Sequence, residues 1–130
     1  MWGEEETGPA VDLSAIGSGV LWGLLLMLVS AMLLGVWDFR AAPSPETEAG
    51  RTIVLQVVAA ALSGFRAAWL AGRAGILHGL LAGLGLIASA VVVIGVLTDL
   101  PTMVSLLKGF IAGGGAGALA GVAAVNLGRG

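Results

Sequence analysis

Three basic residues that follow one another closely along the chain are its strongest candidates for chemistry. Arg66 precedes Arg73 by seven residues, and His78 follows five residues later. Seven residues are two helical turns, so both arginines would share a face if one helix continued through them. Cationic side chains at the edge of an apolar segment either reach toward lipid phosphates or bind a specific anionic ligand or partner protein. The sequence therefore predicts Arg66, Arg73 and His78 as lipid-headgroup or partner contacts at one membrane interface.

Other kinds of functional site have little support in the residue inventory. The chain has no Cys and a single His, so neither a thiolate nucleophile nor an all-histidine metal site can be built within it. The eight acidic residues all lie outside the long apolar segments, where a proton-coupled transporter generally needs a carboxylate. The net charge of −2 gives no basic surface for nucleic acid. We therefore expect no enzyme, no cofactor, no bound metal and no nucleic-acid partner.

The composition indicates a membrane protein. Hydrophobic residues make up 58% of the 130 residues and charged residues only 11%, whereas soluble domains have roughly 25% charged residues. A bilayer core needs about 20 mostly apolar residues per helix. The sequence predicts one all-α membrane domain over residues 1–130, a bundle of four transmembrane helices with spans at 16–37, 52–72, 75–97 and 101–125.

The segments between the spans contain recognisable helix boundaries. Residues 38–51 form the longest expected loop, and within it Ser44 followed by Pro45 is typical of a helix N-cap with proline at the first position. The second helix is therefore expected to begin near Pro45, before it enters the membrane. Glycines at 72 and 75 predict a tight turn between the second and third spans. Asp99 and Pro101 predict the start of the fourth helix.

Glycine and alanine recur at four-residue spacing in every span. Residues i and i+4 share a helix face, and small faces allow the close backbone approach that holds helices together in lipid. We expect these faces to pack within the bundle, and the alternative is that one face is reserved for another subunit. The predicted helix-packing residues are Gly19, Gly23, Gly64, Gly79, Gly83, Gly109, Gly113, Gly117 and Gly121.

The stretch from Ser63 to Gly83 combines a small pair, an aromatic, two alanines, the basic turn at Arg73 and a Gly-x-x-x-Gly start of the third helix. In this it resembles an uncharacterised family of small four-span membrane proteins from spore-forming and related Gram-positive bacteria. Ser63 departs from the family, which more often has glycine there. The resemblance implies a bacterial inner-membrane location with Arg73 and both termini in the cytoplasm. It implies no biochemical activity.

Two classes of function remain open at this point. The first is a structural or accessory subunit that packs through its Gly/Ala faces against another membrane protein or a second copy of itself. The second is a small channel or carrier for a solute or ion, formed by oligomerisation. A conducting path needs a continuous polar lining, and faces of Gly and Ala suit contact better than water. The expected partners are the lipid bilayer, another membrane protein or the chain itself.

Overall fold

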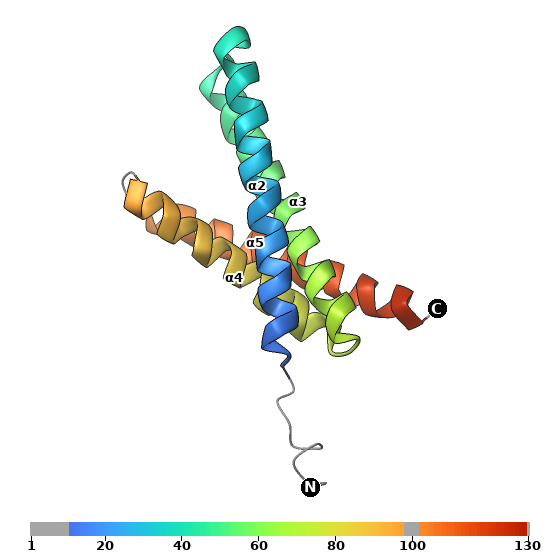
Figure 1. Cartoon of the computed structure of the whole chain (residues 1–130). Coiled ribbons are helices and arrows are strands. Elements are labelled where there is room, and N and C mark those ends of the chain that lie inside the picture. Colours follow the sequence, from blue (N-terminus) through green and yellow to red (C-terminus); the bar gives the residue numbers. More distant parts are fainter. Residues whose placement is uncertain (1–10, 98–101, 130) are drawn as a thin grey trace, which may run out of the picture.

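The computed structural model describes residues 11–97 and 102–129, and within them the secondary structure consists of four α-helices (Figure 1). Each helix is long and apolar enough to cross a membrane, which confirms the all-α, four-span prediction. Their bounds are α2 Leu13–Ala41, α3 Pro45–Ala71, α4 Gly75–Leu97 and α5 Met103–Arg129. The third predicted span has the bounds of α4. Helix α2 extends beyond its predicted span at both ends, α3 begins seven residues before its span, and α5 continues four residues past its span.

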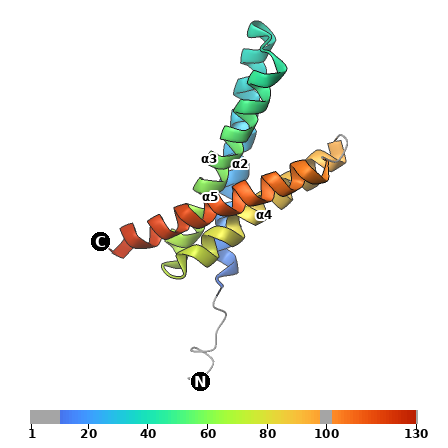
Figure 2. The same cartoon turned by 180° about the vertical axis from the view of Figure 1, so that it is seen from behind.

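The helices form two antiparallel hairpins that cross. Figures 1 and 2 show α2 and α3 side by side in one hairpin and α4 and α5 in the other. All four helices meet near the turn between α3 and α4, and the hairpins diverge toward the α2–α3 and α4–α5 connections. Burial follows this geometry, because the buried residues of α2 are Ala15, Gly19 and Gly23, all in its first half.

The connection between α2 and α3 is shorter than the expected loop over 38–51. Helix α2 continues to Ala41 and α3 begins at Pro45, so only residues 42–44 lie between them. The Ser44 hydroxyl accepts a hydrogen bond from the Thr47 amide at 3.3 Å, which confirms the predicted N-cap. Counting apolar residues does not detect the extra helical turns at 38–41 and 45–51, because these turns contain polar and charged residues. An ion pair between Asp38 and Arg51, at 2.8 Å, joins the two helices there.

The other helix ends follow local chemistry. Gly72 ends α3 with a positive φ of 70°, and its amide donates to the Ala68 carbonyl at 2.8 Å. Only glycine adopts this conformation without steric cost, so the predicted tight turn is confirmed. At the start of α5, the Thr102 hydroxyl accepts from the Ser105 amide at 3.2 Å. Asp99 and Pro101, predicted to mark this start, lie outside the described residues.

The core consists mainly of small side chains. Alanines dominate the buried apolar positions, and the largest fully buried side chains are Leu86, His78 and Ser63. Ala59, Ala60 and Leu86 form one buried cluster where the hairpins cross. A core of this kind is stabilised by close backbone contact rather than by bulky side chains.

Candidate functional site

The glycines of α4 and α5 form a continuous seam. Adding a Cβ to Gly79 would place it against the Gly117 carbonyl oxygen, and a Cβ on Gly117 would meet the Gly79 carbonyl in return. Gly75 and Gly121 block each other in the same reciprocal way, and a Cβ on Gly83 would meet the carbonyl of Gly113. Each step of four residues along α4 is thus matched by a step of four back along α5. This seam is an intramolecular interface, so it is not open to another subunit.

The remaining predicted packing glycines lie at helix crossings or beside the seam. Gly64 of α3 lies against the backbone of Gly117. In α2, Gly19 lies against the carbonyl of Ser63, and a Cβ on Gly23 would approach the Leu86 side chain to 2.9 Å. Gly109 differs from the rest, because a Cβ there would have ordinary contact with Ile87 at 3.6 Å. The close approach at Gly109 that the four-residue spacing suggested is therefore absent.

His78 lies in the interior, which differs from the expectation of an interfacial basic cluster. Its side chain is fully buried. The Asp12 amide donates to Nε2 at 2.9 Å, and Nδ1 lies 3.0 Å from the Ala74 carbonyl oxygen. Because an amide can only donate and a carbonyl can only accept, the ring is a neutral imidazole with its proton on Nδ1. With both nitrogens engaged, His78 joins the start of α2 to the start of α4 and offers no atom to a lipid.

Arg66 of α3 lies against side chains of α2. Its guanidinium carbon is 5.4 Å from the centre of the Trp22 ring, a cation–π arrangement. Its Nε donates to the Ser18 hydroxyl at 3.4 Å. Among the described residues no carboxylate forms an ion pair with this side chain. Arg66 is therefore held against α2 by an aromatic face and a hydroxyl group.

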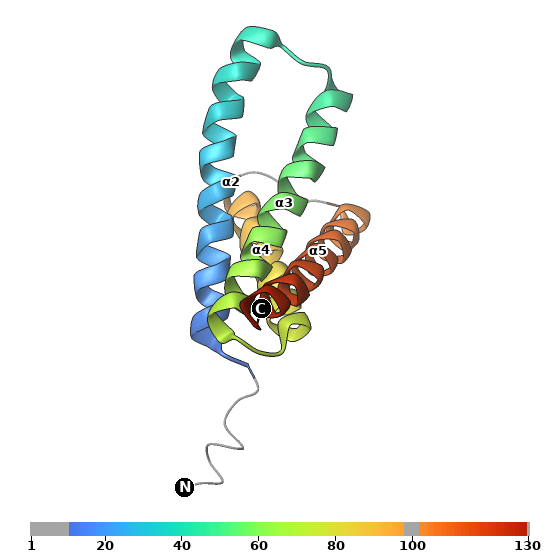
Figure 3. The same ribbon diagram turned by 90° about the vertical axis from the view of Figure 1, so that its right-hand side faces the viewer.

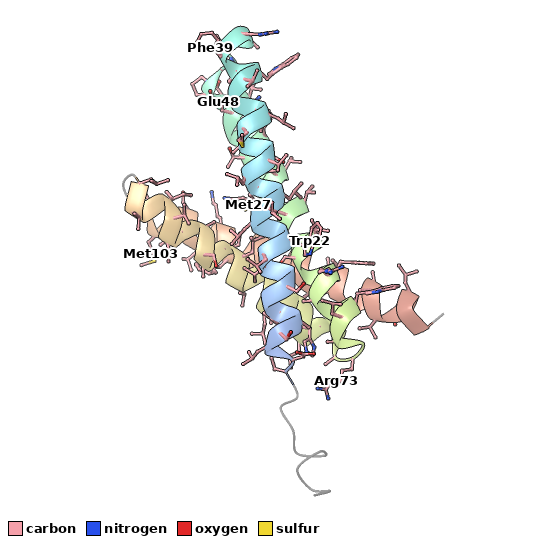
Figure 4. The ribbon with its side chains drawn as sticks, in the orientation of Figure 1. Trp22, Met27, Phe39, Glu48, Arg73 and Met103 are labelled. Carbon is pink, nitrogen blue, oxygen red and sulfur yellow. The ribbon has the colours of Figure 1, made fainter. Side chains whose placement is uncertain are left out.

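Arg73 is separated from the other two basic residues. It is an exposed residue on the turn that joins α3 to α4 (Figure 4). The two-turn spacing does not put it on the face of Arg66, because α3 ends at Ala71 and Gly72 redirects the chain. Arg66, Arg73 and His78 thus occupy three environments near the same end of the molecule.

A shallow depression between α2 and α4, lined mostly by α2, escaped the sequence analysis. It has a volume of about 740 Å³. Its small and hydroxyl-bearing lining residues are Ser14, Gly17, Ser18, Gly85 and Ser89, with Val20, Leu21, Trp22 and Leu24 completing it. A Cβ at Gly17 would have no neighbouring atom within 4 Å. Because Gly17 has no glycine or alanine four residues away in either direction, the spacing pattern could not reveal it.

Asp12 is a second residue that the sequence analysis did not single out. Its carboxylate accepts from the Ala15 amide at 3.1 Å and so caps α2, while its own amide binds His78. An aspartate just before a long apolar run was the available signal.

Known proteins give no further identification. No protein-family model matches the chain, and neither the curated proteins nor the solved structures contain a match. Within the described residues there is no group of three or more His, Cys, Asp or Glu side chains that could hold a metal ion. The surface of α2 and its depression are thus the features from which a function is argued.

Proposed function

We propose that this protein is a structural or accessory subunit of a membrane assembly and that it docks through the outer face of α2. The observation that carries the proposal is the depression around Gly17 and Gly85. Small and hydroxyl-bearing residues are enriched where transmembrane helices pack, because they allow close approach and hydrogen bonds between helices. The partner that suits this face is a transmembrane helix of another membrane protein.

The arrangement of the bundle supports this role. Three buried residues of α2, against eight of α4, show how little of α2 the bundle covers. The glycine seam between α4 and α5 forms a support that needs no partner. Helix α2 therefore lies at one side of the two hairpins, and most of its surface is left uncovered.

The number of spans supports a topology in which both ends of the helical region lie on the same side of the membrane. Four helices that can cross a membrane return the chain to the side where it began. We assign the protein to the bacterial inner membrane with both termini in the cytoplasm, on the resemblance of its basic turn at Arg73 to the four-span family. The proposal includes no catalytic step and no cofactor.

The test is a single large side chain in the depression. Gly17→Leu places a large side chain at the depression, and no atom lies within 4 Å of the new Cβ. Gly115→Leu is the matched control on α5, where a Cβ also meets open space. Tagged chains purified from their native membranes in mild detergent are compared by quantitative mass spectrometry. We expect a stoichiometric membrane partner with the wild type and Gly115→Leu, and its loss with Gly17→Leu.

Two results would contradict the proposal. One is recovery of the same partner in equal amount with Gly17→Leu. The other is a particle that holds only copies of this chain and conducts ions or solutes in liposomes, which would favour the oligomeric channel or carrier instead.

A further inference from the structure

A cleft opens between the outer halves of α2 and α3. It has a volume of about 570 Å³, within the range of small-ligand pockets. Figure 3 shows the two helices apart next to the connection at 42–44. Its walls are mostly apolar, with Leu26, Ser30 and Leu34 from α2 and Gly50, Val54, Leu55 and Val58 from α3.

The cleft begins beyond the closest approach of this hairpin. At Gly23 the helices are so close that a Cβ would lie 3.1 Å from the Ala59 carbonyl. Beyond that crossing, leucines and valines line the cleft together with the small residues Ser30 and Gly50. Leu26 and Leu34 are eight residues apart, a rise of about 12 Å. This is close to the depth of one leaflet, half of a bilayer core of about 30 Å.

Side chains of opposite charge line the cleft next to the α2–α3 connection. Arg51 and Glu46 both line it, together with Thr47. One Nη of Arg51 is paired with Asp38 at 2.8 Å, but its buried Nε has no hydrogen-bond partner within the part of the chain that the structure describes. The Arg51 side chain keeps about a quarter of its surface exposed and lines the cleft, so its guanidinium can bind a ligand oxygen there.

We propose that this cleft binds one phospholipid whose headgroup contains both a phosphate and a primary ammonium, as in phosphatidylethanolamine. A phosphate oxygen accepts from the exposed part of the Arg51 guanidinium, and the ammonium donates to the Glu46 carboxylate. One acyl chain lies along the apolar walls. The charges favour this headgroup over others: an anionic lipid would be repelled by Asp38, Glu46 and Glu48, and a choline group has no N–H to donate.

Lipid competition tests the preference. The detergent-purified chain is incubated with equimolar phosphatidylethanolamine, phosphatidylcholine and phosphatidylglycerol of identical acyl chains, and bound lipid is counted by native mass spectrometry. One exposed ion pair contributes up to about 1 kcal/mol, a factor of about five. We therefore expect an excess of phosphatidylethanolamine over each competitor of about three- to fivefold.

Matched variants separate the parts of the site. Arg51→Gln should lower the binding of all three lipids, whereas Glu46→Gln should remove the preference and leave total binding nearly unchanged. Arg40→Gln alters an exposed charge of the same tip that does not line the cleft, so it should retain the preference. Gly50→Leu fills the cleft from a position with no atom within 4 Å of the new Cβ, and Gly35→Leu is its equally open control outside the cleft.

The proposal is overturned if the three lipids bind equally, or if Gly50→Leu and Gly35→Leu retain the same amount of lipid. It is also overturned if a dimer forms that Gly50→Leu disrupts, because a second copy would then occupy the cleft. Circular dichroism of each variant verifies that the helices are intact.

Discussion

At the scale of single residues, His78 shows how burial changes the meaning of a side chain. A lone histidine at the start of an apolar segment is compatible with an interfacial cation. Its surroundings instead supply one donor, the Asp12 amide, and one acceptor, the Ala74 carbonyl. These two partners fix a neutral ring, and the bond from Asp12 to His78 joins the starts of α2 and α4 across 66 residues of sequence.

Replacing this ring should loosen the start of α2. In His78→Leu the partly buried Asp12 amide loses its acceptor, whereas the Ala74 carbonyl keeps its bond from the backbone amide of residue 78. A hydrogen bond of this kind contributes about 0.5–1.5 kcal/mol. We expect the free energy of unfolding to fall by about that amount in mixed micelles titrated with SDS, followed by circular dichroism. Ile76→Leu, at an exposed position on the same turn, is the control. An unchanged midpoint for His78→Leu would show that these hydrogen bonds contribute nothing to stability.

At the scale of helices, close packing depends on which glycines face a neighbour. Spacing alone makes Gly109 equivalent to Gly113, Gly117 and Gly121. The structure separates them, because the last three lie against α4 backbone or the Ile87 side chain at close range and Gly109 does not. The glycines of α5 should therefore differ widely in their tolerance of substitution.

A pair of alanine substitutions tests this difference. Gly79→Ala places a Cβ against the Gly117 carbonyl, and overpacking of this kind typically costs about 1–3 kcal/mol. Gly115→Ala meets open space and replaces a poor helix former, which stabilises a helix by up to about 1 kcal/mol. The same SDS titration should shift the two midpoints in opposite directions. Equal shifts would mean that the α4–α5 seam is not closely packed.

At the scale of the whole molecule, the crossing of the hairpins determines which surfaces are covered. Ala68 of α3 and Ala124 of α5 belong to one buried cluster near the α3–α4 turn. Met32 and Val92, in contrast, are exposed residues in the diverging outer halves of α2 and α4. Residues are therefore buried where the hairpins cross and exposed to the surroundings where the hairpins diverge.

Disulfide trapping can verify this crossing, because the chain has no cysteine of its own. Ala68→Cys combined with Ala124→Cys should form an intramolecular disulfide under mild oxidation, detected as a mobility shift on a non-reducing gel. Met32→Cys combined with Val92→Cys should not. Efficient trapping of the second pair would mean that the hairpins run together along their full length.

The sequence by itself determined much of the architecture. Its apolar segments predicted four membrane-crossing helices, since each must be long enough to span a bilayer. The caps at Ser44 and Gly72 were also predictable, because hydroxyl capping and positive φ are local requirements. Spans and caps can be predicted from the local pattern of charge and hydropathy, because they do not depend on which helix lies next to them.

Only the tertiary structure decided what each face of a helix touches. Sequence spacing could not distinguish Gly109, which has only ordinary contact with Ile87, from Gly117, which lies against the backbone of α4. It could not show that His78 is buried, because both partners of the ring are backbone groups, which every sequence supplies. It also missed the cleft at Arg51, since a separation between helices depends on where two faces stop fitting together. Buried faces, hydrogen-bond partners and clefts depend on how two helices pack together. The sequence of a single helix does not specify which helix lies next to it.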